Sequence, residues 1–504
     1  MREAGILLHI TSLPGKYGCG SLGKCAYDFV DFLKKSNQHI WQILPIGPTS
    51  YGDSPYSALS NFGFNYYFID LDLLVKDGLL DKDDLPKPFE CKRVDFNSLT
   101  KERFDLFHKA YQRKDIYLDG FNKFKEKEAY WLNDYARFTV LKAMHDDKPW
   151  YMWYDDWKYR NNNSLMWLDN EKWYDIDFYK FIQYLFYKQF IDLRIYANKR
   201  GISIMGDMPK YFAYVSSDVS AHPSDFQLNP DLTPKAVAGC PPDFFSPDGQ
   251  LWGNPLYDWE KMKNNNYNFW ILRVKHSFEL FDILRIDHFR GFEGYYSIPY
   301  GDETAKYGHW EVGPGYDLFK AINKECKNAR IVAENLGFLT PGVHKLLKKC
   351  GYPGMNIFQF ELGDGKKAPI KKGFKENNIF YTGTHDNQTL MSFYNDLEYK
   401  YKKLVDDVCN IKFNDKPNLK IIEYAMNTNC DIVIIPIQDY LGLSDDIGRM
   451  NAPSTISKSN WSYISRSYNY TKELSDYIKT ITKNSNRGWF YENFYYLYRW
   501  LFCW

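Results

Sequence analysis

The 504-residue sequence lacks a long hydrophobic run and an excess of charge of either sign. No stretch of 18 apolar residues occurs, which excludes a membrane-spanning helix. The 64 basic and 63 acidic residues nearly cancel, so the chain offers no attractive field for nucleic acid or an anionic membrane. A neutral substrate suits this balance, as do many others.

Paired cysteines and a targeting segment are also lacking. The nine cysteines are odd in number, scattered and never spaced as C-x-x-C, which predicts reduced thiols rather than disulfides or a zinc site. The N-terminus carries Glu3 and enters an apolar run at Gly5, unlike a signal peptide. We therefore expect a cytoplasmic protein.

Motifs for hydride transfer, phosphate chemistry or metal catalysis are missing, so we expect no cofactor and no metal. Aromatic residues, in contrast, are abundant at 18% of the chain, with 42 Tyr and 15 Trp. Most aromatic side chains pack in cores. Flat rings can also cover the C–H faces of sugar rings, and both interpretations stay open here.

Eight short apolar runs recur along the chain, each ending in polar or small residues. They span residues 5–10, 39–45, 202–207, 281–287, 330–334, 355–360, 379–384 and 431–439. Helical patterns fall between several of them: the stretch 181–200 ends at Gly201, and the stretch 341–350 opens with the cap Thr340 and ends at Gly351. This alternation predicts an α/β protein with a (β/α)8 TIM barrel. A doubly wound open sheet is the rival, but no glycine-rich phosphate loop supports it.

Large insertions are expected after strands two, three and eight of this barrel, within one catalytic unit that spans residues 1–504. About 155 residues separate strands two and three, far more than one crossover needs. Residues 73–180 are expected to form a mostly helical subdomain. Residues 209–265 are expected to contribute a loop that caps the active site, and a third insertion covers about 440–465.

Three barrel strands end in acidic residues, namely Asp287, Glu334 and Asp386, and Asp207 ends a fourth. Catalytic groups of such barrels stand at the carboxyl ends of the strands. Two carboxyl groups at one mouth are what the cleavage of a glycosidic bond with retention requires, one as nucleophile and one as acid. Arg285 lies two residues before Asp287 on the same face of a strand and can keep that carboxylate ionised.

Simpler interpretations exist for each of these residues. A single acidic residue is most often a solvated loop carboxylate or half of a structural ion pair. The His385-Asp386 pair is a weak signal by itself, and His288 could be a packed histidine. Three acids at strand ends with Arg and His partners make the catalytic interpretation stronger.

The motifs around these residues resemble those of the amylomaltase or 4-α-glucanotransferase family, glycoside hydrolase family 77 of the α-amylase clan. The matching segments run nearly end to end. They begin at residues 11, 54, 206, 241, 249, 285, 333, 383 and 449, reading TSLPG, SPYS, GDMP, PPD, GQLWGNP, RIDHFRG, AENLG, GTHDN and RMN. The three carboxylate motifs indicate the clan, and the QLWGNP and PPD segments narrow it to the family.

The resemblance implies a retaining 4-α-glucanotransferase that moves α-1,4-glucan segments between maltooligosaccharides, glucose and other glucans. It assigns Asp287 as the nucleophile, Glu334 as the acid/base and Asp386 as the third carboxylate, which binds sugar hydroxyls. The expected substrate-binding residues are Tyr56, Asp207, Gln250, Trp252, Asn254, Arg285, His288, Asn335 and His385. We expect a monomer or weak homodimer.

Other functions fit parts of the pattern. The nearest is an α-amylase-type hydrolase on the same barrel, which would yield only shorter sugars. A catalytically silent glucan-binding protein would lack one of the three acids, and all three are present. An unrelated barrel enzyme would make the flanking motifs a coincidence.

Overall fold

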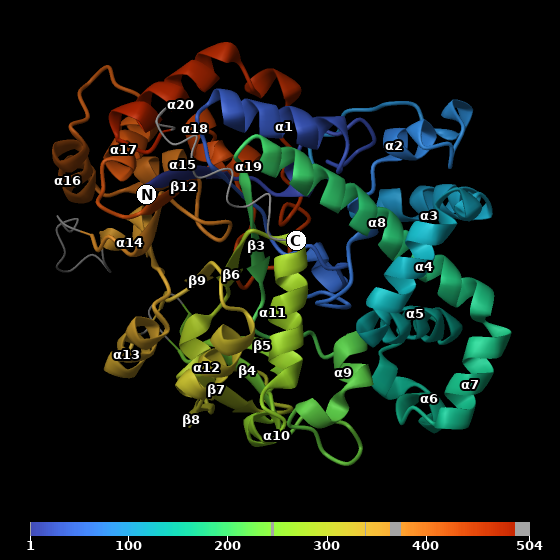
Figure 1. The fold of residues 1–504 in the computed structure, drawn as a ribbon. Coiled ribbons are helices and arrows are strands. Elements are labelled where there is room, and N and C mark those ends of the chain that lie inside the picture. Colours follow the sequence, from blue (N-terminus) through green and yellow to red (C-terminus); the bar gives the residue numbers. More distant parts are fainter. Residues whose placement is uncertain (1, 243–245, 338, 363–373, 489–504) are drawn as a thin grey trace.

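The structure is a computed structural model, and it describes residues 2–242, 246–337, 339–362 and 374–488. Eight parallel strands lie in the order β10-β11-β12-β1-β2-β3-β6-β9. They are β1 (Glu3–Leu7), β2 (Ile40–Gln42), β3 (Ser203–Met208), β6 (Ile283–Ile286), β9 (Ile331–Ala333), β10 (Gly354–Ile357), β11 (Asn378–Tyr381) and β12 (Ile432–Pro436). Each overlaps one of the eight apolar runs, and the predicted (β/α)8 barrel is confirmed (Figure 1).

The edges of this sheet, β9 and β10, meet through few contacts. The Ala333 amide donates a hydrogen bond of 2.9 Å to the Pro353 carbonyl. Beyond the end of β9, the Met355 amide of β10 donates to the side-chain oxygen of Asn335 at 2.6 Å. The Asn335 side chain thus takes the place of a backbone partner where the barrel closes.

Among the described residues, seven helices pack around the barrel. They are α1 (Lys24–Lys35), α8 (Trp173–Lys199), α11 (Asn268–Leu280), α12 (Gly315–Glu325), α13 (Pro341–Cys350), α17 (Pro417–Met426) and α20 (Lys472–Asn484). The α13 boundaries follow the sequence signals, because the Thr340 side chain accepts from the Val343 amide and Gly351 ends the helix at φ 73°. Further helices over the later strands are α14 (Phe358–Glu361), α15 (Leu390–Asp396), α16 (Tyr399–Cys409), α18 (Ile437–Leu441) and α19 (Asp445–Gly448).

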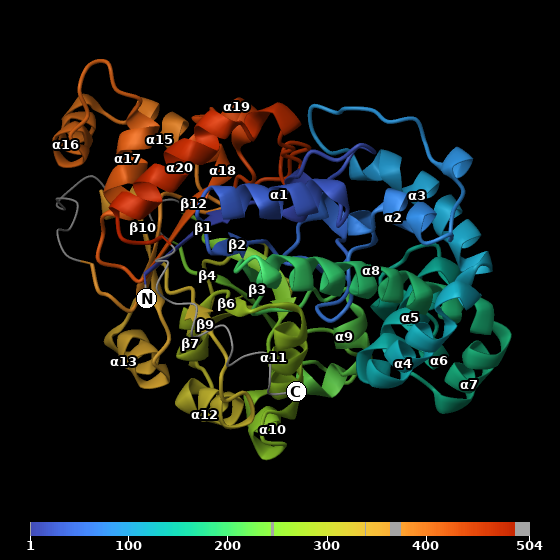
Figure 2. The same ribbon diagram turned by 45° about the horizontal axis from the view of Figure 1, so that its top comes forward.

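The segment between β2 and β3 forms a helical body beside the barrel (Figures 1 and 2). It contains α2 (Leu71–Lys76), α3 (Phe96–Gln112), α4 (Leu118–Lys127), α5 (Ala129–Met144), α6 (Asp155–Lys158) and α7 (Asn162–Glu171). The 27-residue helix α8 packs against α3 and α5 and also against α1 and β3. One long helix therefore joins the insertion to the barrel.

A second, antiparallel sheet that the sequence did not indicate lies near the barrel mouth. Its order is β5 (Gln250–Pro255), β4 (Ala236–Cys240), β7 (Gly294–Pro299) and β8 (His309–Val312). Residues 209–265 thus supply strands as well as α9 (Ser217–Ala221) and α10 (Trp259–Asn264). The other two strands come from the segment after β6, where no insertion was predicted.

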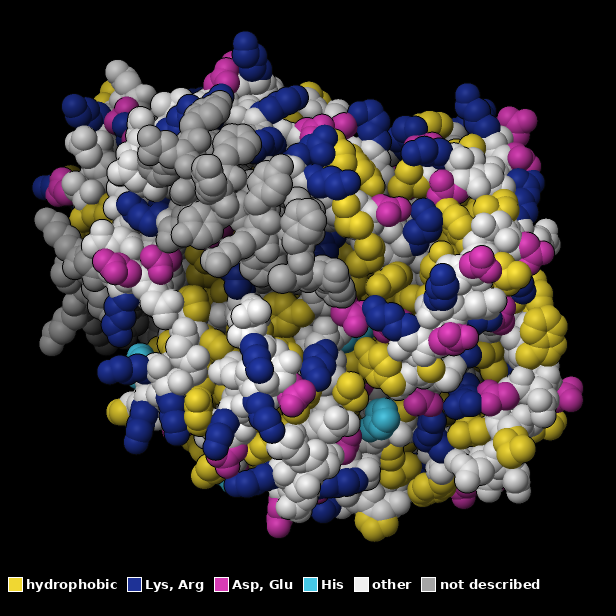
Figure 3. All heavy atoms as spheres, viewed as in Figure 1, with side chains coloured by type: hydrophobic (Ala, Val, Ile, Leu, Met, Phe, Trp, Pro, Cys, Tyr) yellow, Lys and Arg dark blue, Asp and Glu magenta, His cyan; other side chains and the backbone are white. Residues whose placement is uncertain are grey.

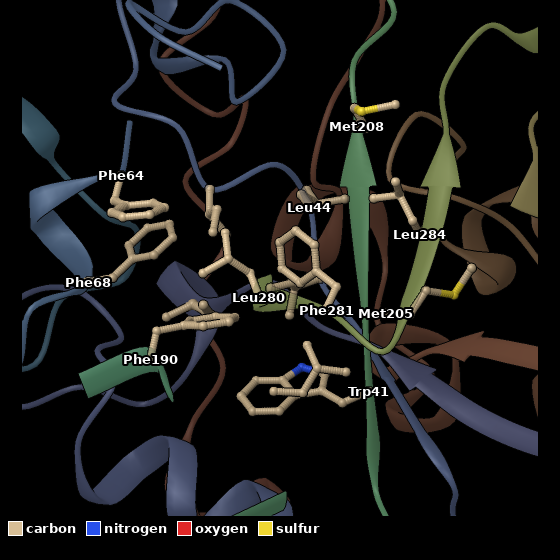
Figure 4. Close-up of a cluster of buried hydrophobic side chains, with 14 of the residues drawn as sticks. Trp41, Leu44, Phe64, Phe68, Phe190, Met205, Met208, Leu280, Phe281 and Leu284 are labelled. Carbon is tan, nitrogen blue, oxygen red and sulfur yellow. The ribbon is translucent and has the colours of Figure 1, made fainter. Parts of the chain in front are cut away.

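Aromatic side chains fill the space between the barrel and the insertion (Figure 4). The ring of Phe190 from α8 meets that of Phe281 at 5.8 Å, edge to face. The Phe281 ring also packs on β3 at Gly206, where an added Cβ would lie 2.3 Å from it. Burial of one such side chain stabilises the fold by about 1.5–3 kcal/mol. This cluster fixes the strand that carries Asp207.

The structure bears on two expectations, the absence of a membrane-spanning helix and the state of the cysteines. In the described ranges, no helix is long and apolar enough to cross a membrane. The eight cysteines in those ranges are free, as predicted for reduced thiols.

The bottom of the barrel offers a test of stability at Arg487, which is fully buried. Its guanidinium donates to the carbonyl oxygens of Glu3, Met426, Thr428, Cys430 and Asp431 at 2.7–3.3 Å. Arg487→Met removes all of these hydrogen bonds from a buried site, so we expect the free energy of unfolding to fall by about 3–5 kcal/mol in chemical denaturation. Lys483→Met on the exposed face of α20 is the control and should change it by less than about 0.5 kcal/mol; equal effects would contradict the assignment.

Candidate active site

The buried centre of the barrel mouth is Arg285 on β6. Strand register pairs it with Asp207 on β3, so the two side chains share a face. Arg285 Nη1 donates to both Asp207 oxygens at 2.7 and 2.6 Å, and to Asp287 Oδ1 at 3.1 Å. Asp207 and Arg285 are almost fully buried, whereas the Asp287 side chain is 27% exposed. The guanidinium therefore links a buried carboxylate to one that reaches the open mouth.

Glu334 stands directly after β9 and faces the same mouth. Its Oε2 accepts from the His288 amide at 2.6 Å, and its Oε1 accepts from the Leu336 amide at 3.0 Å. His288 follows Asp287 in the chain and has φ 46°, the left-handed conformation that costs a non-glycine residue about 1–2 kcal/mol. That turn brings the amide beside Asp287 onto the Glu334 carboxylate, so both acids lie in one pocket.

Asp386 and His385 enter the pocket from the loop after β11. His385 Nε2 lies 3.3 Å from Asp386 Oδ2, and the Asn451 amide nitrogen donates to Asp386 Oδ1 at 2.7 Å. Burial by itself would raise the pKa of Asp386, but the His385 charge and the hydrogen bonds from His385 and Asn451 lower this pKa to about 2. The Asp386 carboxylate is therefore held ionised.

Three rings form the wall next to these carboxylates. Tyr56 stacks on His385 with ring centres 4.9 Å apart, and Trp461 touches both at 5.8 and 5.7 Å. The Tyr56 hydroxyl donates to Asp207 Oδ2 at 2.7 Å. Burial and the Asp207 charge raise the pKa of Tyr56 well above its usual value, so the hydroxyl remains a donor.

His288 and Trp252 close the other side of the pocket. The Trp252 ring stands edge-on to the His288 ring at 5.0 Å, and its Nε1 donates to Gln250 Oε1 at 3.1 Å. His288 Nε2 is buried and has no hydrogen-bond partner among the described residues. Burial and the nearby charges of Lys210 and Arg290 lower the pKa of His288 to about 3. A neutral imidazole with one free nitrogen thus lines the pocket.

Most of the residues predicted from the sequence meet at this mouth, but two are occupied elsewhere. The Asn254 side chain donates to the Phe212 carbonyl at 2.7 Å, and the Asn335 oxygen accepts from Met355 as described above. Each holds main chain in place, and direct sugar contact by either remains a prediction. The capping-loop residues 243–245, at which the PPD motif ends, lie outside the described residues.

Sequence reasoning missed three side chains of the site. Asn451 lies in the RMN segment but received no role, although it binds Asp386. Trp461 follows no strand and carried no signal. Tyr381 ends β11, and its hydroxyl donates to Gln42 on β2 at 2.9 Å, beneath the charged groups. No pattern in the sequence marked Tyr381, since the other barrel strands end in non-aromatic residues.

The titration of Asp287 reflects its crowded surroundings. Burial raises its pKa to about 7, and the Glu334 and Asp207 charges add to this rise while those of Arg285 and His385 oppose it. Asp287 is therefore more easily protonated than an exposed aspartate. Within the described residues, no group of three or more His, Cys, Asp or Glu side chains could hold a metal ion.

A family model described as 4-alpha-glucanotransferase matches residues 8–467. The chain belongs to the 4-alpha-glucanotransferase family. A 4-alpha-glucanotransferase of Clostridium butyricum is 42% identical over 483 residues, covering 94% of this chain and 99% of the relative. The family enzyme of Aquifex aeolicus is 40% identical over 480 residues, covering 94% and 98%.

A solved member of the family has the same architecture. The amylomaltase from Streptococcus agalactiae, determined in complex with acarbose, superposes with a TM-score of 0.93. It is 36% identical, and the match covers 97% of this chain and 100% of that one. The family resemblance inferred from the motifs is therefore confirmed.

The Tyr56 hydroxyl permits a test of the buried network. Tyr56→Phe keeps the ring on His385 but removes a hydrogen bond to a buried charge, which contributes about 1.5–3 kcal/mol. We expect a loss of that size in the free energy of unfolding, measured by denaturant titration. Tyr27→Phe removes a hydroxyl that makes no hydrogen bond in the described part of the chain, and an equal loss there would contradict the role of Tyr56.

Proposed function

We propose that this protein transfers α-1,4-glucan segments from a donor maltooligosaccharide to the 4-hydroxyl of an acceptor glucan or glucose. The observation that carries the proposal is the hydrogen bond from the His288 amide to Glu334, which sets two carboxyl groups side by side at one mouth. Membership in a family of 4-alpha-glucanotransferases favours transfer over hydrolysis. The free cysteines agree with a cytoplasmic location.

In the first half-reaction, Asp287 is the nucleophile and Glu334 the acid. The Glu334 proton passes to the glycosidic oxygen as the bond from that oxygen to the anomeric carbon breaks, while an Asp287 oxygen bonds to the same carbon from the opposite face. Arg285 opposes the rise in the pKa of Asp287 and so favours its ionised state, while Glu334 must carry a proton for this step. The product is a β-linked glucosyl-enzyme and a free glucan end.

In the second half-reaction, the acceptor 4-hydroxyl replaces the leaving piece. Glu334 takes its proton, the new oxygen bonds to the anomeric carbon, and the Asp287 ester breaks. Two inversions give net retention. Both carboxyl groups return to their starting protonation states, so no other reactant is needed.

The remaining groups would hold the sugar at the reaction centre. Asp386 is kept ionised and can accept hydroxyl hydrogens, and His385 beside it can donate or accept. His288 offers its unpaired Nε2 to another hydroxyl. The edge of Trp252 stands over His288, where it can exclude water from the glucosyl-enzyme and favour transfer to a sugar.

Removal of the Asp287 carboxylate should prevent formation of the ester, whereas removal of the Glu334 carboxyl group should prevent proton transfer. We expect Asp287→Asn and Glu334→Gln each to lower disproportionation of maltotriose at least about a thousandfold. A maltosyl fluoride donor needs no acid, because fluoride departs unaided. Glu334→Gln should therefore still form the ester and accumulate a glycosyl-enzyme at Asp287, detectable by mass spectrometry of the peptide.

Asp218→Asn is the matched control. It replaces a buried aspartate that accepts hydrogen bonds from Ser60 and Asn61 and takes no part in the active-site pocket. It should disproportionate maltotriose normally. Full activity of Asp287→Asn, or label on a peptide without Asp287, would rule out the assignment.

The pH dependence of the reaction should report the crowding around Asp287. Asp287 must be ionised to attack, and its raised pKa of about 7 predicts that kcat/KM increases with pH through this value. Asp207→Asn removes a neighbouring negative charge that raises this pKa, so the acidic limb should move to lower pH. Asp218→Asn should leave the limb in place. An unchanged or upward-shifted limb in Asp207→Asn would be inconsistent with this electrostatic account.

A further inference from the structure

A second cavity lies away from the barrel mouth, where the helical insertion meets the barrel. It has a volume of about 270 Å³ and is bounded by α5, α9 and the first turn of α11. Pockets for drug-sized ligands span about 300–1,000 Å³, so this one fits a smaller group. On the face of the molecule seen in Figure 3, hydrophobic, acidic and histidine side chains lie close together beside α9.

The inner surface of this cavity is aromatic. Phe62 and Phe269 are buried and meet edge to face with ring centres 6.0 Å apart, and Tyr130 packs against Phe62 at 5.8 Å. Tyr130 is 40% exposed and stands at the rim. Differently inclined rings form a concave apolar surface, which suits the C–H face of one pyranose ring.

The polar rim has unused hydrogen-bonding capacity. The main chain of Asp225 is fixed, because its amide donates to the His222 carbonyl at 3.0 Å and its carbonyl accepts from Asp258 at 2.9 Å. In the described part of the chain, however, no donor reaches the Asp225 carboxylate, and burial raises its pKa. The His222 ring and the side-chain amide of Asn268, which are exposed and line the same rim, make no hydrogen bond to any described side chain or backbone group. The half-buried Asp225 carboxylate can accept a hydrogen bond from a hydroxyl-bearing ligand, and the exposed His222 and Asn268 side chains can bond its neighbouring hydroxyls.

The groups behind the cavity are rigidly held. The Tyr130 hydroxyl lies 3.0 Å from His276 Nδ1, and His276 Nε2 donates to the Phe62 carbonyl at 3.0 Å. Asp218 accepts from Asn61 and Ser60 at 3.0 and 3.3 Å. The cavity is therefore shaped before any ligand binds, which lowers the cost of binding.

The charged side chains that line the cavity indicate which class of ligand can bind there. No Lys or Arg lines the cavity within the described residues, so an anion is disfavoured. Asp134 pairs with Arg160, and Asp218 is satisfied as described, which leaves Asp225 as the one carboxylate there without a described donor. We propose that this cavity is a secondary saccharide site that holds one glucosyl unit of an α-glucan. This proposal depends on the proposed function only for the identification of the ligand as an α-glucan.

Such a site would tether a long glucan while another segment reacts at the barrel mouth. Two linked contacts bind a polymer much more tightly than either contact does alone. Maltotriose is too short to use both, so its turnover should not depend on the cavity.

Native gel electrophoresis through glycogen tests this inference, with all variants in an Asp287→Asn background so that glycogen is not remodelled. Asp225→Ala and Tyr130→Ala should each weaken retention by glycogen at least about tenfold. Asp83→Ala removes an equal charge and Tyr154→Ala an exposed ring from other surfaces, and both should migrate unchanged. Tyr130→Phe, which keeps the ring, should retain most of the binding.

A parallel assay separates this inference from the proposed function. In the active enzyme, Asp225→Ala and Tyr130→Phe should disproportionate maltotriose within about twofold of wild type. Wild-type retention by Asp225→Ala and Tyr130→Ala would overturn the secondary site even if transfer is normal. Absence of maltotriose disproportionation in the wild type would refute the proposed function, while the gel result could still be interpreted.

Discussion

The Arg285 guanidinium is the contact on which the rest of the site depends. It sits almost fully buried between Asp207, which it binds through both oxygens, and Asp287, which it reaches at 3.1 Å. A buried charge without a partner would cost several kcal/mol, so the three side chains must remain together. The barrel register that pairs β3 with β6 makes this possible, and the aromatic packing at Gly206 holds β3 in place.

The carboxyl groups around Arg285 have pKa values that are shifted in opposite directions. Asp386 is held ionised by His385 and Asn451, while burial and neighbouring acids raise the pKa of Asp287. The strained turn at His288 places a backbone donor on Glu334 beside Asp287. Strain at such a position is stable only because the surrounding strands fix both of its ends. The same fold therefore supplies an ionised carboxylate at Asp386 and a carboxyl group with a raised pKa at Asp287.

The barrel and its acidic residues were predictable because their causes are local. Each strand is a short apolar run, and two of the acids follow a strand directly, Asp287 after β6 and Glu334 after β9. The cap at Thr340 and the left-handed glycine at 351 gave the boundaries of α13 for the same reason. The role of Arg285 beside Asp287 followed from the two-residue period of a strand.

What the sequence did not reveal depends on contacts between distant segments. Asn451 reaches Asp386 across 65 residues, and Trp461 packs at an angle against rings from two other loops. The antiparallel sheet joins strands from the segments after β3 and after β6, and its four short strands carry no long apolar run. Asn335 was assigned to sugar binding through its motif, but its oxygen binds the main chain where the barrel closes.

In the proposed reaction, Asp287 and Glu334 act on one anomeric carbon. A crystal structure of the Asp287→Asn variant with a bound maltooligosaccharide would measure the separation of the two side-chain carbonyl carbons across the cleaved bond. The account predicts about 5–5.5 Å, with the anomeric carbon next to residue 287 and the glycosidic oxygen next to Glu334. A separation of about 6.5–9.5 Å with room for a water molecule, or a glucan bound outside this pocket, would contradict it.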